Sequence, residues 1–112
     1  MNVEQTIIQG LRAAGFDAYA DAPNPMPSSF VTVERTGGPT RDMVDKAVLA
    51  VQCWAGGRKA AADMADAARA ALNEMTGTRG LGAVTVDSIY NWPDAQSHKA
   101  RYQLTVTAVA HV

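Results

Sequence analysis

AVLAVQCW, residues 47–54, runs through Ala55, Gly56 and Gly57 into the alanine-rich stretch RKAAADMADAARAALNEM, residues 58–75. This order predicts a strand, a tight turn and a long helix. Both faces of the strand are largely apolar, which is typical of a strand in the middle of a sheet. The helix carries a stripe of small and apolar side chains that lets it lie close to a sheet: Ala61, Met64, Ala65, Ala68, Leu72 and Met75.

The rest of the chain predicts a second helix and further strands. Asn2 followed by Gln5 resembles a capping box and predicts a helix that ends at Gly15. Alternating apolar and polar residues predict the remaining strands at Phe30–Thr36, Ala83–Trp92 and Ala100–Val112, with a short one within Phe16–Asp21.

Two connections complete this organisation. The three prolines of Ala22–Ser29 predict a loop, and the turn residues and charges of Gly37–Lys46 predict a long polar hairpin connection. The order of elements predicts an α+β fold, in which a mainly antiparallel sheet of four or five strands has two helices packed on one face. Residues 1–112 suit a single domain with one core.

The other face of the sheet is predicted to be uncovered. In the last strand Tyr102, Leu104, Val106 and Ala108 are expected to face the core. The uncovered face would then carry Gln103, Thr105 and Thr107, with Gln52 and Trp54 beside them. In Ala83–Trp92 the alternation places Val84, Val86 and Tyr90 together, opposite Thr85, Asp87 and Asn91. A face of this mixed character can be solvated or docked against another subunit.

The composition argues against nucleic acid and membranes as partners. Ten lysines and arginines stand against eleven aspartates and glutamates, without a basic run. No signal-peptide pattern is visible, and no apolar run approaches the ~20 residues of a membrane span. The single cysteine allows no intrachain disulfide and fits a reducing compartment. We expect a soluble protein that is cytoplasmic when made.

No group of residues predicts catalysis, a cofactor or a metal. His98 and His111 lack a second ligand or a carboxylate at a motif spacing. Gly77, Gly80 and Gly82 lack the Lys-Ser/Thr ending and the following helix of a phosphate loop. We therefore predict no catalytic, cofactor-binding or metal-binding residue.

Acidic residues and the cysteine leave alternatives open. Asp42 and Asp45 could share a cation with Glu34 or Asp87 if their loop folds back, but a solvated acidic loop is the favoured interpretation. Cys53 lies in an apolar strand without a histidine at a recognisable spacing, which favours a core thiol over a nucleophile.

Tryptophans and arginines are the candidates for contacts with a neighbouring molecule. Trp54 and Trp92 lie at strand ends, where Trp92 is predicted to cap the core and Trp54 could do the same or anchor a subunit contact. Arg35, Arg41 and Arg101 could bridge to acidic groups on a neighbour, although exposed arginines are mostly solvated, and only Arg41, on the long hairpin, stands out.

The order of parts resembles a known family. A capped N-terminal helix is followed by a proline-rich loop after YAD, the strand FVTVERTGG, the strand AVLAVQCWA, an alanine-rich helix and a closing RYQLTVTAV strand. This arrangement resembles the tail terminator, or tail completion, proteins of long-tailed bacteriophages, particularly those of actinobacterial phages and prophages. The likeness covers nearly the whole chain and includes no active-site signature.

The resemblance implies a structural role without catalysis. Members of that family have an α/β fold and form a hexameric ring on the finished tail tube, which stops tube polymerisation and presents a surface to the head-side connector. Homo-oligomer, tail tube protein and head-tail connector protein are thus the expected partners, in the host cytoplasm during assembly and then at the head-proximal end of the virion tail. By position, the residues expected at subunit or tube contacts are Arg35, Gly37, Gly38, Arg41, Asp42, Met43, Trp54, Gln103 and Thr105.

Two other functions compete with this one. A head-to-tail connector or stopper would bind portal-side components instead of the tube. A small enzyme or ligand-binding domain would use Cys53 or Asp87 in a pocket between the helices and the sheet, although nothing in the sequence activates either group.

Overall fold

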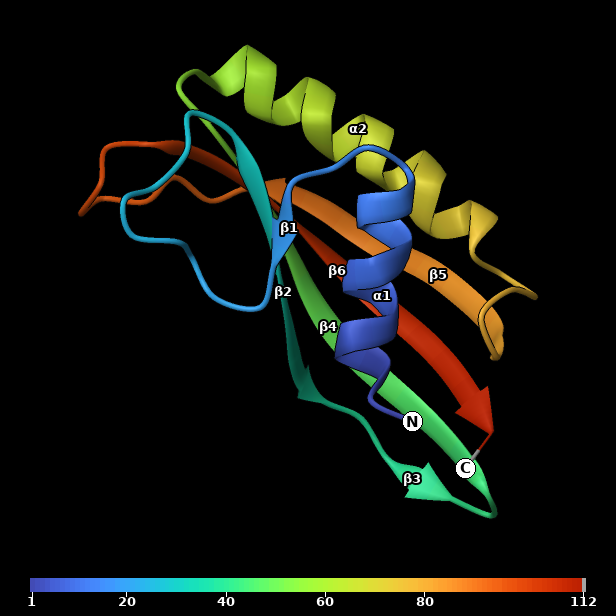
Figure 1. Ribbon diagram of the computed structural model, residues 1–112. Coiled ribbons are helices and arrows are strands. Elements are labelled where there is room, and N and C mark those ends of the chain that lie inside the picture. The colour runs from blue at the N-terminus through green and yellow to red at the C-terminus, as the bar shows by residue number, and fades with distance from the viewer. Residues whose placement is uncertain (112) are drawn as a thin grey trace.

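The computed structural model describes residues 1–111 and shows two helices beside one sheet (Figure 1). The elements in chain order are α1 (Val3–Ala13), β1 (Ala18–Tyr19), β2 (Phe30–Gly37), β3 (Thr40–Arg41), β4 (Val44–Ala55), α2 (Arg58–Glu74), β5 (Leu81–Asn91) and β6 (Ala100–His111). The α+β class and both helices are confirmed. The strand predicted to reach Val112 is described to His111, and Val112 lies outside the described residues.

The sheet has six strands and is mixed, whereas the prediction was a mainly antiparallel sheet of four or five. Its order is β1-β2-β4-β6-β5, with β3 paired to β4, so β4 is central as predicted. All neighbours are antiparallel except β1 and β2, which run parallel because the loop between them carries the chain back before β2 begins. The additional strand, β3, lies within Gly37–Lys46, the segment predicted as a polar connection.

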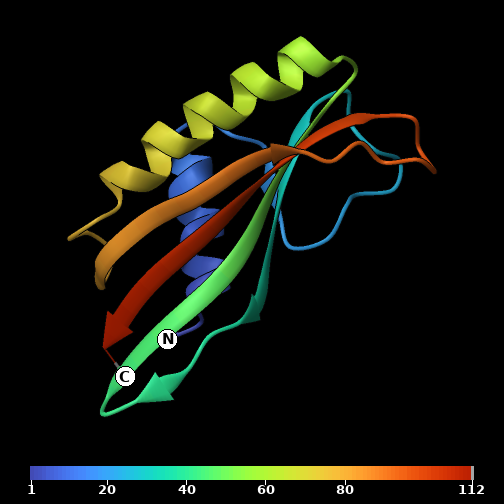
Figure 2. The same ribbon diagram turned by 180° about the vertical axis from the view of Figure 1, so that it is seen from behind.

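One core lies between the helices and one face of the sheet. Figure 2, from behind, has the central strands in front of α1, so the face toward the viewer carries no helix. Ala47, Leu49, Val51 and Cys53 of β4 are fully buried on the helix side, as their alternation predicts. They meet buried residues of both helices, including Ile7, Ile8, Leu11, Ala65, Ala68 and Leu72. Small alanines on α2 let this helix approach the sheet closely.

Local signals at both ends of α1 act as predicted. The Asn2 side chain accepts a hydrogen bond from the backbone N–H of Gln5 at 3.1 Å. After Ala13 the chain turns through Gly15 at φ +97°, where the N–H groups of Gly15 and Phe16 donate to the carbonyls of Arg12 and Leu11. This pair of bonds is a Schellman motif, which favours glycine because of the positive φ.

A bulge in β5 overturns one predicted face. Val86 pairs with Val106, but Ser88 pairs with Thr105, so one extra residue is inserted between them. The alternation is reset at this point, and Tyr90 pairs with Gln103 on the uncovered face instead of lying with Val84 and Val86. A shift of one residue moves every later side chain of a strand to the other face.

The molecule is elongated, with principal extents of 43 × 24 × 23 Å. Its long axis follows β4, and the β3–β4 hairpin projects beyond the helices at one end (Figure 1). We call residues 37–46 the hairpin arm. Neither helix within residues 1–111 is long and apolar enough to cross a bilayer.

Candidate interaction site

The predicted contact residues fall in two places. Gly37, Gly38, Arg41, Asp42 and Met43 lie on the hairpin arm and are exposed, and Arg35 lies at its base. Trp54, Gln103 and Thr105 belong to the uncovered face of β4 and β6. The structure therefore offers two surfaces, an arm and a sheet face, and does not gather these residues into one site.

The tip of the hairpin arm is a two-residue turn under backbone strain. Asp42 and Met43 have φ +53° and +66°, the combination that defines a type I′ turn. Such turns favour Asn-Gly or Asp-Gly, because a side chain on the second residue is disfavoured at positive φ. Met43 nevertheless occupies that position, and 70% of it is exposed. A strained, exposed thioether at the end of a projecting arm is suited to contact with another surface.

Replacing Met43 by glycine is expected to stabilise the isolated protein by about 1 kcal/mol, because the strain at this φ is relieved. Thermal unfolding should show a rise in Tm of roughly 3–6 °C. Asp42→Gly is the matched control and should gain less, because aspartate tolerates positive φ better than methionine. A lower Tm for Met43→Gly would contradict the assignment of strain to this residue.

Arg35 acts within the chain at the base of the arm. Its guanidinium binds both carboxylate oxygens of Asp45, at 2.7 and 2.6 Å, and donates to the carbonyls of Gly37 and Gly38. Thr40 donates a third bond to Asp45 at 3.0 Å. Through these bonds Arg35 holds the bend between β2 and β3 as an internal clamp, and its contact with a neighbour stays a prediction. No sequence signal links positions 35 and 45.

Stability should fall in acid through this clamp. The hydrogen bond from Arg35 lowers the pKa of Asp45 below its ordinary 3.8, and the bond from Thr40 acts in the same direction. A carboxyl whose pKa is lowered by folding contributes stability above its unfolded pKa and loses it as the pH falls through the folded value. Thermal melts between pH 7 and pH 3 should therefore show a smaller decrease in Tm for Asp45→Asn than for the wild type. Parallel decreases would contradict this role.

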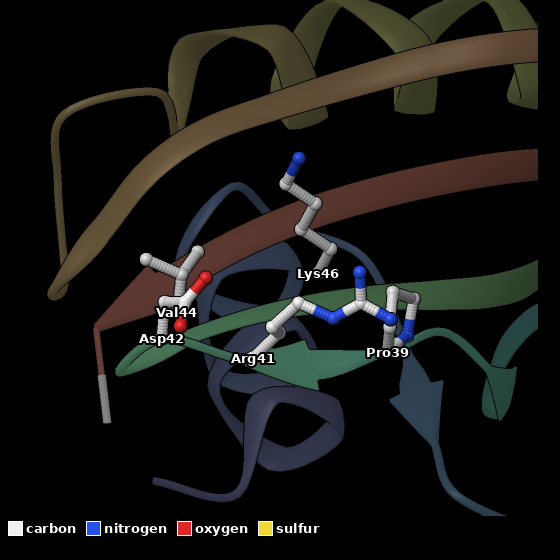
Figure 3. Close-up of a pocket in the computed structure, with 5 residues that line it drawn as sticks. All are labelled: Pro39, Arg41, Asp42, Val44 and Lys46. Carbon is white, nitrogen blue, oxygen red and sulfur yellow. The ribbon is translucent and has the colours of Figure 1, made fainter.

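A shallow hollow lies beside the tip of the arm (Figure 3). It has a volume of about 270 Å³ and is lined by Pro39, Arg41, Asp42, Val44 and Lys46. Two cationic side chains and one carboxylate line it together with apolar stems. An acidic side chain of a neighbouring molecule would be complementary to this lining. Arg41, predicted as the stronger arginine candidate, is thus placed at an exposed hollow.

A chain of hydrogen bonds crosses the uncovered face from β2 to β5. The Trp54 Nε1–H donates to Thr32 Oγ1 at 3.0 Å, and the Thr32 hydroxyl donates to Gln52 Oε1 at 3.2 Å. Gln52 Nε2 donates to Gln103 Oε1 at 2.8 Å, and Gln103 Nε2 donates to the Tyr90 hydroxyl oxygen. Gln103 is buried with its amide committed to this chain, so its effect on any partner passes through Tyr90.

Small and β-branched side chains occupy the same face nearer the arm. Val48, Thr105, Thr107 and Val109 are partly exposed on neighbouring positions of β4 and β6. Neither helix of residues 1–111 packs on this face of the sheet (Figure 2). The face is low in relief and mixes methyl and hydroxyl groups, as in surfaces that can exchange water for another protein.

The core-capping alternative holds for Trp54, whereas the core-capping prediction for Trp92 is wrong. Trp54 is buried, stacking on Phe30 at 5.2 Å between ring centroids, whereas Trp92 is exposed and does not cap the core. The Arg101 guanidinium lies over both indoles, 4.8 Å from the Trp54 ring and 4.5 Å from the Trp92 ring. Trp92 is therefore the exposed tryptophan of the two, although the sequence predicted that it caps the core.

The remaining candidate chemical groups lie apart. Cys53 is fully buried, and burial raises the pKa of its thiol to about 12, which confirms the core-thiol interpretation. Asp87 accepts a hydrogen bond from Thr107 at 2.7 Å. Among residues 1–111, no group of three histidine, cysteine, aspartate or glutamate side chains could hold a metal ion.

No protein-family model matches this chain, and no curated protein is significantly similar to it.

Proposed function

We propose that this chain is a non-catalytic assembly protein of the tail-terminator type. Copies of it associate into a ring of about six that caps a tail tube, ends tube growth and presents its other side to a head-tail connector. The ring size, the tube and the connector come from the family resemblance, and head-to-tail contacts that close a ring are a common symmetry of assemblies.

The observation that supports this proposal is the hairpin arm. It extends past the helices, carries a strained and exposed Met43 at its tip, and has a cationic hollow beside it. An arm of this kind contributes little to its own core and is suited to reach a second molecule. The uncovered sheet face supplies a second contact surface, so that one copy has different surfaces for its two neighbours.

Light scattering after size exclusion tests the proposal, alone and with isolated tail tubes. The expected result is a closed oligomer in solution or on the tube ends, and inhibition of further tube growth. Arg41→Glu should lower the oligomer or the tube-bound fraction, because it reverses the charge of the hollow. Arg58→Glu, an exposed reversal at the start of α2, is the matched control for net charge and should leave both unchanged.

Two outcomes count against the proposal. A protein that stays monomeric and does not bind tail tubes would refute it. A protein that ignores tubes but is captured by connector components would instead be a stopper of the head-tail joint.

A further inference from the structure

β5 forms one edge of the sheet, and the backbone of its second half is free on the outer side. Trp92 N–H donates to the Arg101 carbonyl at 2.9 Å, so residue 92 is bonded to the β6 side. In an antiparallel ladder these bonded positions alternate, so Tyr90 and Ser88 also turn their backbone groups toward β6. The N–H and C=O groups of Ile89 and Asn91 therefore point outward, without a partner among residues 1–111.

Exposed hydrophobic side chains gather at this same edge. Ile89, Tyr90 and Trp92 are 37%, 42% and 48% exposed, and together they represent half of the large exposed hydrophobic residues of the described chain. Tyr90 and Trp92 lie against each other with ring centroids 6.4 Å apart. Unpaired backbone combined with apolar side chains is the signature of a strand that can accept another strand.

The other stretches of sheet edge are closed. Along β2, β1 pairs with Val31 and Thr32, and the Glu4 carboxylate accepts the Arg35 N–H at 2.8 Å. In the first half of β5, the Thr76 hydroxyl bonds both the N–H and the C=O of Val84. The short β3 pairs with β4 through only two residues. Ser88–Asn91 is thus the one segment of the described chain with the length and the side chains for pairing.

We propose that two copies of this chain pair through Ser88–Asn91 of β5, antiparallel about a two-fold axis. Extension of the sheet from one copy to the next in a head-to-tail manner needs two different open edges, and the β2 edge is closed. A second copy can therefore join the sheet only with the same edge, which gives a closed, isologous pair. The inference concerns a surface apart from the hairpin arm and does not rest on the proposed ring.

Charge and the bulge fix the register. The bulge before Ser88 ends the regular ladder at Asp87, so the pairing is centred on Ile89. In this register the two Asp87 charges lie at opposite ends of the paired segment. The Asp87 side chain stays on the uncovered face, where it accepts a hydrogen bond from Thr107. A register centred on Asp87 would place like charges opposite each other, which is unfavourable. The two Ile89 residues face each other on the helix side.

Cross-linking through one engineered position tests both the edge and its symmetry. Ile89 is a hydrogen-bonded position, where facing Cα atoms are about 5.5 Å apart, within the range of a disulfide. Ile89→Cys should therefore form a covalent dimer under mild oxidation, and Cys53 adds no background because it is buried. Ser88→Cys is the matched control and should cross-link much more slowly, because residue 88 faces residue 90 of the second copy. Equal rates, or no cross-linking, would overturn the proposal.

A proline variant separates pairing from folding. Ile89→Pro removes an N–H that makes no bond within the chain, and proline is tolerated on edge strands. It should weaken dimerisation by roughly tenfold or more, through loss of the two symmetry-related bonds, while circular dichroism stays native. Ile89→Lys, which places two like charges across the axis, should do the same without backbone change. Unchanged sedimentation in both variants would refute the pairing.

The outcomes for edge and arm are distinguishable. Arg41→Glu should leave the Ile89→Cys cross-link intact, and Ile89→Pro should leave an arm-mediated ring intact. A wild-type protein that sediments as a monomer at tens of micromolar while a foreign protein protects β5 would show that the edge serves another partner, and would overturn the two-copy proposal.

Discussion

Alanine at Gly38 is expected to destabilise the protein by roughly 3 kcal/mol or more, whereas alanine at the adjacent Gly37 should change stability by less than about 1 kcal/mol. Gly38 has φ +98°, a conformation that L side chains rarely adopt. A Cβ there would lie 2.0 Å from the Lys46 carbonyl oxygen and 2.8 Å from the Val48 nitrogen. Both are backbone atoms of β4, so the clash is relieved only if the arm separates from the sheet.

Gly37 is the matched control because a Cβ at this position meets nothing within 4 Å. Urea unfolding of the two variants measures the difference directly. Similar midpoints for both would mean that the bend at Gly38 is not as tight as described. Gly38→Ala should also loosen the packing of the hairpin arm on β4, whereas Gly37→Ala should leave the arm in place.

Removal of the Trp54 indole is the second large effect, with an expected loss of about 3–5 kcal/mol for Trp54→Ala. Only 6% of Trp54 is exposed, and its ring stacks on Phe30, lies under Arg101 and donates a hydrogen bond to Thr32. A loss of this size is a substantial part of the ~5–15 kcal/mol that stabilises a typical domain. Thermal and urea unfolding should both show it.

Trp92→Ala is the control for this prediction and should lose about 1 kcal/mol or less, since nearly half of that residue is exposed. Trp54→Phe should fall between the two, because it keeps an aromatic ring on Phe30 but leaves Thr32 without its donor. If Trp92→Ala were the more damaging change, the core-capping role predicted from the sequence would be restored to Trp92.

Sequence patterns predicted the elements that depend on long periodic segments. The alternation in residues 47–54 and the small-residue stripe of α2 both act over many positions, so that single exceptions do not hide them. The same holds for β2 and for the alternation of Leu104, Val106 and Ala108 in β6. The helix cap at Asn2 and the helix end at Gly15 were also predicted, because each depends on an interaction between residues close in sequence.

Features that depend on a single residue or on distant pairs were not predictable. The bulge at Asp87 inserts one residue without a glycine or proline to mark it, and it moves Tyr90 to the other face. The tip of the arm has Asp-Met where a type I′ turn usually has Asp-Gly, so its tightness and β3 were missed. Arg35 and Asp45 meet only because β2 and β4 pair, and the parallel pairing of β1 with β2 has no local signal at all.

The position of β6 between β4 and β5 has a consequence for how the protein is made. β6 is the last strand in the sequence, yet it pairs along all of β4 on one side and most of β5 on the other. β5 and β6 are consecutive and form a hairpin, whereas β4 and β6 are far apart in the chain, so their pairing forms more slowly because a long loop must close first. Until residues 100–111 are available, β4 and β5 have no strand between them, and the edges that β6 will occupy are open to other nascent chains. Completion of the sheet must therefore wait until β6 has left the exit tunnel.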